Sequence, residues 1–114
     1  MNLSEEEIIK QAEGFLERRK PTVFSKEQEV EQEIEALRHC IDLYDKNILY
    51  NLQKRMNVVD DIQKLKDKID KPTVDADREI DILEYLSDSI DSEYLGLVHE
   101  LYSVIFKFVK DKYE

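Results

Sequence analysis

The sequence predicts an all-α protein, and three observations support that prediction. Of its 114 residues, 41% are hydrophobic and 39% are charged, whereas only two glycines and two prolines are present. A chain rich in Leu, Ile, Glu, Lys and Asp and poor in turn formers is typical of helical proteins. The apolar residues recur with the period of a helix rather than alternating as in a strand. The length suits one domain.

A short first helix is expected over residues 5–19. Ser4 and Glu7 have the spacing of a capping box. A basic cluster followed by Pro21 is expected to end this helix, because cations suit the negative end of the helix dipole. A helix this short is unstable alone, so we expect it to dock on another element through one apolar stripe: Ile8, Ala12, Phe15 and Leu16.

A long helix is expected from Ser25, with Gln28 in the capping-box position, to about residue 69. At about 1.5 Å per residue it would be roughly 60 Å long, whereas a compact chain of this size has a radius of gyration of about 13 Å. The other residues cannot cover a stripe of that length, so we expect a dimer whose long helices pack together. The stripe is Leu37, Ile41, Tyr44, Ile48, Leu52, Arg55, Val59, Ile62 and Lys66.

Two shorter helices are expected to follow. Breaks at Pro72 and at residues 88–92 delimit a third helix over residues 75–89 and a fourth from about residue 93 onward. The third carries a stripe of Glu79, Ile80, Leu83, Leu86 and Ile90. The fourth presents Leu97, Val98, Leu101, Tyr102, Ile105, Phe108 and Val109.

The charge balance excludes several classes of partner. The formal net charge is −10, from 17 basic and 27 acidic residues, and such a surface repels nucleic acid and anionic lipid. The acidic start lacks the basic and then apolar pattern of a signal peptide, and no apolar run approaches the roughly 20 residues of a membrane span. We expect a cytoplasmic protein that binds neither nucleic acid nor membrane.

Cysteine and histidine offer no metal site. Cys40 is the only cysteine and cannot form an internal disulfide, which suits a reducing compartment. His39 and Cys40 point about 100° apart on a helix, and His99 is isolated in the sequence. We assign none of these three residues to chemistry.

Two cations interrupt the stripe of the long helix. Arg55 and Lys66 lie within about 20° of Leu37 on a helical wheel and about 16 Å apart along the axis. Because an unpaired buried cation costs several kcal/mol, something anionic should meet them. Two long side chains can lean together and bind one small anion between them.

Other charged residues extend this candidate pocket. Arg38 lies about 25 Å from Arg55 along the helix, so it can reach a partner's pocket in an antiparallel dimer but not its own. Asp75, Arg78 and Glu79 begin the third helix, and carboxylates beside a cationic pocket suit a substrate with carboxylate and hydroxyl groups.

Four of these residues also have an ordinary structural explanation. Arg55 could extend its charge to water at the rim of a core. Asp75 could cap the third helix, and Arg78 and Glu79 could form a solvated pair.

The ordered set of residues resembles the all-helical, type II (AroQ-class) chorismate mutases. The match consists of residues 37–49 (LRHCIDLYDKNIL), Arg55, Lys66 and residues 72–79 (PTVDADRE), within a region of about 34–110. Each element is weak alone, but the order and spacing are fairly specific. The resemblance implies an intertwined homodimer of three-helix chains, with residues 25–114 as the mutase-like domain and 1–24 as a helical extension.

The resemblance also implies the site and its chemistry. Arg38 from the partner chain and Arg55 would bind the carboxylates of chorismate, and Lys66 would donate to its ether oxygen. Asp75 and Glu79 would hold the hydroxyl end of the ring, with Arg78 shaping the local field. The reaction is the rearrangement of chorismate to prephenate in aromatic amino acid biosynthesis. Fixed cations suffice for it, so no cofactor or metal is expected.

One departure from the family pattern lies near the end of the chain. The family usually carries a Ser and, four residues later, a Gln that also donates to the ether oxygen. Val109 and Tyr113 occupy these positions, or Glu114 the second one if the alignment slips by one residue. Two other functions therefore stay open: an enzyme acting on isochorismate or an amino analogue of chorismate, and a non-catalytic helical interaction protein.

Overall fold

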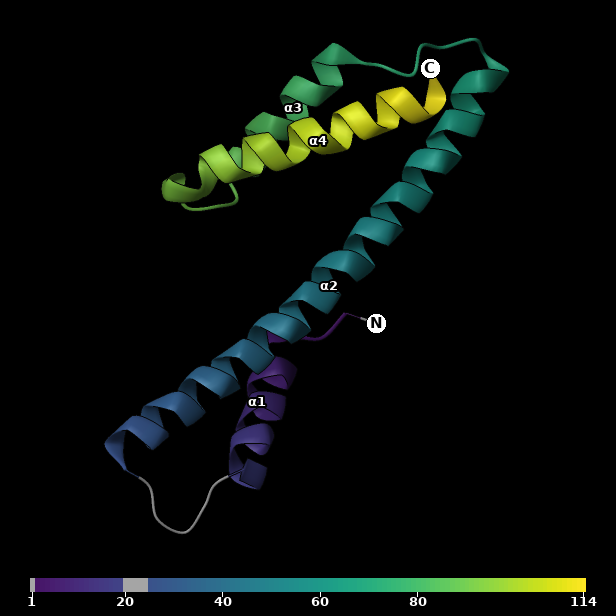
Figure 1. Cartoon of the computed structure of the whole chain (residues 1–114). Helices are drawn as coiled ribbons and strands as arrows, with labels where there is room; N and C mark the ends of the chain where they lie inside the picture. The colour runs from purple at the N-terminus through teal and green to yellow at the C-terminus, as the bar shows by residue number, and fades with distance from the viewer. Residues whose placement is uncertain (1, 20–24) are drawn as a thin grey trace. The chain divides into compact units, whose positions relative to one another are not determined.

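The computed structural model describes residues 2–19 and 25–114, and the all-α prediction is confirmed. Four α-helices follow one another, with a short 3-10 helix (Ser92–Tyr94) before the last (Figure 1). They are α1 (Glu5–Arg19), α2 (Lys26–Lys68), α3 (Ala76–Ser87) and α4 (Leu95–Tyr113). The chain divides into two compact units, Met1–Val58 and Val59–Glu114, so α2 contributes to both.

The first two helices begin where the sequence predicts, each at a serine that caps the helix. The amide of Glu7 donates to Ser4 Oγ at 3.1 Å, and the amide of Gln28 donates to Ser25 Oγ at 3.2 Å. Gln28 accepts the Ser25 amide in return, at 3.0 Å, which completes the reciprocal capping box. Pro21, predicted to end the first helix, lies outside the described residues.

In the first unit, α1 docks along α2. Ile8, Ala12 and Leu43 are buried, with Ile8 fully inaccessible to solvent. At one end of α1 the Phe15 ring stacks on the His39 ring, with 5.0 Å between centroids. At the other end the Asn47 side chain accepts from the Leu3 amide at 2.6 Å and donates to the Leu3 carbonyl at 2.7 Å. Residues of α2 therefore contact α1 or the residues just before it at both ends of the docked segment, and α1 lies along α2 (Figure 1).

In the second unit, α3 packs on α4, and the end of α4 contacts α2. The Tyr102 and Phe106 rings of α4 are 5.9 Å apart and tilted. The Lys112 ammonium pairs with Asp60 of α2 at 3.0 Å. The Lys112–Asp60 pair brings the carboxyl end of α4 to the carboxyl-terminal part of α2 within this unit.

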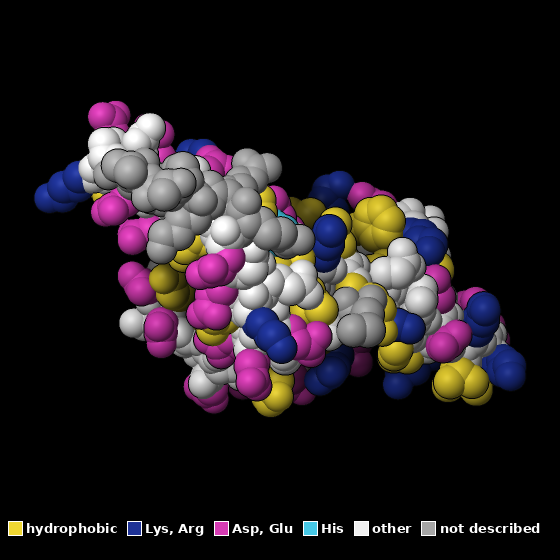
Figure 2. Space-filling model, turned by 90° about the horizontal axis from the view of Figure 1, so that it is seen from below, with side chains coloured by type: hydrophobic (Ala, Val, Ile, Leu, Met, Phe, Trp, Pro, Cys, Tyr) yellow, Lys and Arg dark blue, Asp and Glu magenta, His cyan; other side chains and the backbone are white. Residues whose placement is uncertain are grey.

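Much of the predicted apolar stripe of α2 is exposed in the single chain. Leu37 and Ile48 are 63% and 61% exposed. Four further members of the stripe are exposed to a smaller extent: Ile41, Tyr44, Leu52 and Ile62. A second apolar row is exposed on α4: Leu97, Leu101, Val104 and Phe108. Yellow hydrophobic side chains accordingly reach the surface among charged ones (Figure 2). Ile80 and Ile90 of the third predicted stripe are also exposed rather than buried within the chain.

Replacing Ile8 by alanine is expected to weaken the docking of α1 on α2 by about 2–5 kcal/mol, because it leaves a cavity at the fully buried side chain of a short helix. Hydrogen exchange of the α1 amides measures this effect. Ile9→Ala is the matched control, since Ile9 is 47% exposed. Unchanged protection of α1 in the Ile8 variant would contradict the docking described above.

Candidate active site

Lys66 is the best-defined member of the predicted site. It is half-buried near the end of α2, and its ammonium donates to the backbone carbonyl of Thr73 at 3.0 Å. The acceptor is neutral, so the positive charge of Lys66 is not compensated by this contact, and the ammonium retains further N–H groups. The role of Thr73 could not be predicted from the sequence, because every residue type has a backbone carbonyl.

The start of α3 follows Thr73 directly. Asp75 is the N-cap of α3 and accepts the Arg78 amide at 3.0 Å, so the capping explanation of Asp75 is confirmed. Its own carbonyl accepts the Glu79 amide at 3.1 Å. Glu79 is half-buried, whereas Asp75 and Arg78 are exposed. The segment from Thr73 to Glu79 thus connects the Lys66 ammonium to a partly shielded carboxylate.

The two predicted arginines belong to the first unit. Arg55 is half-buried on α2. The Arg38 side chain is 68% exposed and pairs with Glu35, one turn earlier on the same helix, at 2.7 Å. An exposed ion pair of this kind contributes little to stability. Arg38 can therefore leave Glu35 and pair with a different carboxylate at little cost in free energy.

The end of α4 carries a buried hydroxyl. Tyr113 is half-buried, and its hydroxyl oxygen is inaccessible to solvent and has no hydrogen-bond partner among the residues the structure describes. Buried polar atoms normally have a partner, so such a group needs an explanation. Glu114 is exposed, and Val109 is half-buried and has no donor. Of the alternatives at this place, Tyr113 is therefore the one that offers a shielded donor.

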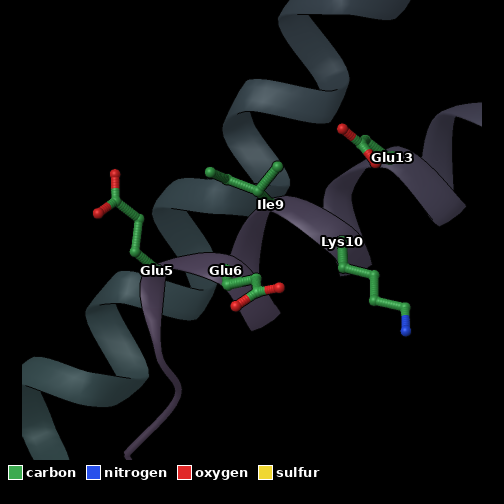
Figure 3. Close-up of a pocket in the computed structure, with 5 residues that line it drawn as sticks. All are labelled: Glu5, Glu6, Ile9, Lys10 and Glu13. Carbon is green, nitrogen blue, oxygen red and sulfur yellow. The ribbon is translucent and has the colours of Figure 1, made fainter.

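Other features of the surface lack the convergence of a site. A shallow hollow on α1 is lined by Glu5, Glu6, Ile9, Lys10 and Glu13, but its charged side chains spread away from one another (Figure 3). His39 stacks on Phe15, and His99 lies 3.4 Å from the Ser87 hydroxyl. Within residues 2–19 and 25–114, no group of three or more His, Cys, Asp or Glu side chains is arranged to hold a metal ion.

No helix in the same described ranges combines the length and apolar content required to cross a membrane. Neither the curated proteins nor the solved structures gave a match to this chain. A family model described as chorismate mutase type II matches residues 37–112. This region contains Arg38, Arg55, Lys66 and the start of α3, whereas α1 and the first turns of α2 lie before it. The chain therefore belongs to the type II chorismate mutase family.

Proposed function

We propose that this protein rearranges chorismate to prephenate. The observation that carries the proposal is the half-buried Lys66 ammonium, held by a neutral carbonyl next to the helix start that bears Glu79, in a chain of the mutase family. A cation that keeps its charge can stabilise the negative charge that builds on an ether oxygen as its C–O bond breaks.

In this proposal the other charged residues position the substrate. Arg55, together with Arg38 of a second copy, binds the two carboxylates and holds the folded conformer in which the new C–C bond can form. Glu79 and Asp75 face the hydroxyl end of the ring, with Arg78 beside them. One molecule rearranges internally, so the site needs to hold and stabilise rather than to attack, and orientation supplies much of the rate.

We further propose that the active form is a homodimer. The support is the row of exposed apolar side chains on α2, since contiguous exposed apolar surface of this kind marks an interaction site. A second α2 offers the same row, as a two-fold interface requires. The exposed position of Arg38 also fits a residue that acts on the pocket of another chain.

Tyr113 is proposed as a second donor to the ether oxygen, because its hydroxyl is buried and has no partner among the described residues. Tyr113→Phe removes the hydroxyl and keeps the ring, so we expect kcat to fall about 10²–10³-fold, as for loss of one oxyanion donor. Initial-rate measurements test this prediction. Tyr85→Phe is the control, since Tyr85 is 73% exposed on α3. A Tyr113 variant as fast as the parent would remove Tyr113 from the site.

One experiment separates the proposed activity from its alternatives. The purified protein is incubated with chorismate and, separately, with isochorismate, from mildly acidic to mildly alkaline pH, and the products are identified. Prephenate formation supports the proposal. Release of pyruvate would instead indicate an enzyme of isochorismate or a related compound. A stable assembly that turns over neither substrate would indicate a non-catalytic interaction protein.

A further inference from the structure

The turn that ends α2 has an unusual backbone conformation at Asp70. Asp70 has φ 53°, the one positive φ at a non-glycine residue in the parts of the chain that the structure describes. The Lys66 carbonyl accepts two amides from this turn, those of Ile69 at 3.1 Å and Lys71 at 3.0 Å. The Lys71 amide bonds to a carbonyl five residues earlier, and the residue between them, Asp70, has a left-handed conformation. This is the pattern of a Schellman turn. Asp70 thus occupies the position that glycine usually fills.

The same turn also holds the Lys66 side chain. After the reversal at Asp70 the chain runs back past the helix end, and the Thr73 carbonyl accepts from the Lys66 ammonium at 3.0 Å. Lys66 is therefore bound at its backbone and at its side chain by residues 69–73. A lysine side chain loses rotamer entropy when it is held in one direction, and here part of that loss is incurred on folding rather than on binding.

The Thr73 contact differs from the other lysine contacts of this unit. Lys107 and Lys112 each pair with a carboxylate, Asp111 and Asp60, at 2.7 and 3.0 Å. Lys66 instead donates one N–H to a neutral carbonyl oxygen. This hydrogen bond fixes the direction of the side chain without neutralising its charge. Two residues after Thr73, Asp75 caps α3 and fixes the start of the helix that carries Glu79.

We propose that Asp70 is a positioning residue for Lys66, acting through its left-handed backbone conformation. This conformation closes the turn that places the Thr73 carbonyl against the Lys66 ammonium, so that Lys66 is aimed before the substrate arrives. The proposal rests on the proposed function, in which Lys66 donates to the reacting ether oxygen. The Asp70 carboxylate itself has no part in it.

Three substitutions at Asp70 test the proposal, because residues differ in their tolerance of this conformation. Glycine and asparagine adopt positive φ readily, whereas β-branched valine does not. We expect kcat of Asp70→Val to fall about 10- to 100-fold, since a misplacement of about 1 Å has effects of this size. KM should change little, because Lys66 acts on the reacting oxygen. Asp70→Gly and Asp70→Asn should keep kcat within about twofold of the parent.

A second measurement reads the position of Lys66 without turnover. In NMR spectra, the two protons on Cε of Lys66 should have distinct shifts in the parent and in Asp70→Gly, and a single averaged shift in Asp70→Val. The corresponding signals of Lys107 serve as the internal control. If valine destabilises the fold, Asp70→Ala provides a milder penalty at the same φ and should give intermediate values.

The outcomes distinguish this inference from the proposed function. If Asp70→Val keeps the distinct Lys66 signals or the parental kcat, the positioning role is wrong. If Asp70→Gly is as impaired as Asp70→Val, the carboxylate and not the backbone matters, which also overturns it. If the parent protein has no mutase activity but the Lys66 signals respond as expected, the proposed function fails while the role of the turn stands.

Discussion

Replacing Arg55 by alanine is expected to lower kcat/KM for chorismate about 10³-fold, because the proposed ion pair with a substrate carboxylate is lost, and loss of one partner of such a shielded pair costs about 2–5 kcal/mol. Arg55 is half-buried on α2, and a partly shielded charge interacts more strongly with a bound anion than a fully exposed one. A guanidinium also binds a carboxylate through two parallel hydrogen bonds, and alanine or water cannot reproduce that geometry. Initial rates of prephenate formation over a range of chorismate concentrations measure the loss.

Lys107→Ala is the matched control for this prediction. The pKa of Lys107 is raised, mainly by its hydrogen bond to Asp111 and secondly by the negative charge of that carboxylate. The control therefore also removes a full positive charge. The Lys107 side chain is 78% exposed, and we expect its variant to keep kcat/KM within about twofold of the parent. Equal losses in the two variants would mean that net charge, and not a defined pocket, governs turnover.

Mixing two inactive variants is expected to restore activity if Arg38 acts across the dimer. Arg38→Ala and Arg55→Ala homodimers each lack one essential arginine in both sites. After chain exchange, about half of the dimers contain both variants, and each of these has one site with neither substitution. Activity should therefore rise from near zero to about one quarter of the parental value. Mass spectrometry of isotope-labelled chains confirms that exchange has occurred.

A second mixture provides the control. Arg55 and Lys66 are proposed to act in the pocket of their own chain, so every site in a mixture of Arg55→Ala and Lys66→Ala carries at least one substitution. That mixture should stay inactive after complete exchange. Recovery in both mixtures, or in neither, would refute the shared site and leave Arg38 as a residue of the surface that pairs with Glu35.

The helices themselves were predictable because their signals are local. The capping boxes at Ser4 and Ser25 and the period of the apolar residues depend on neighbours three or four positions away. The structure confirms α1 over Glu5–Arg19 and α2 over Lys26–Lys68. The family was also predictable, since the order and spacing of Arg38, Arg55, Lys66 and residues 72–79 resemble the family pattern, and the matching family model spans residues 37–112.

Contacts between distant residues required the tertiary structure. Leu3 and Asn47 bind each other across 44 positions, and the docking face of α2, which contains His39, Leu43 and Asn47, mixes apolar and polar residues. That face has no apolar periodicity, so the sequence indicated that the first helix docks but not where.

The details around Lys66 also depended on the folded chain. Thr73 acts through a carbonyl that every residue type possesses, and the left-handed conformation of Asp70 is one that aspartate adopts only occasionally. The different burial of Tyr113 and Glu114 at the end of α4 also became known only from the packing of the chain. The helices, the family and the candidate residues were predictable because they follow from local periodicity and spacing. Which groups are shielded became known only from the folded chain, because burial arises when distant segments meet. How Lys66 is held also required the structure, because it depends on a backbone carbonyl and a backbone conformation that residue identity does not specify.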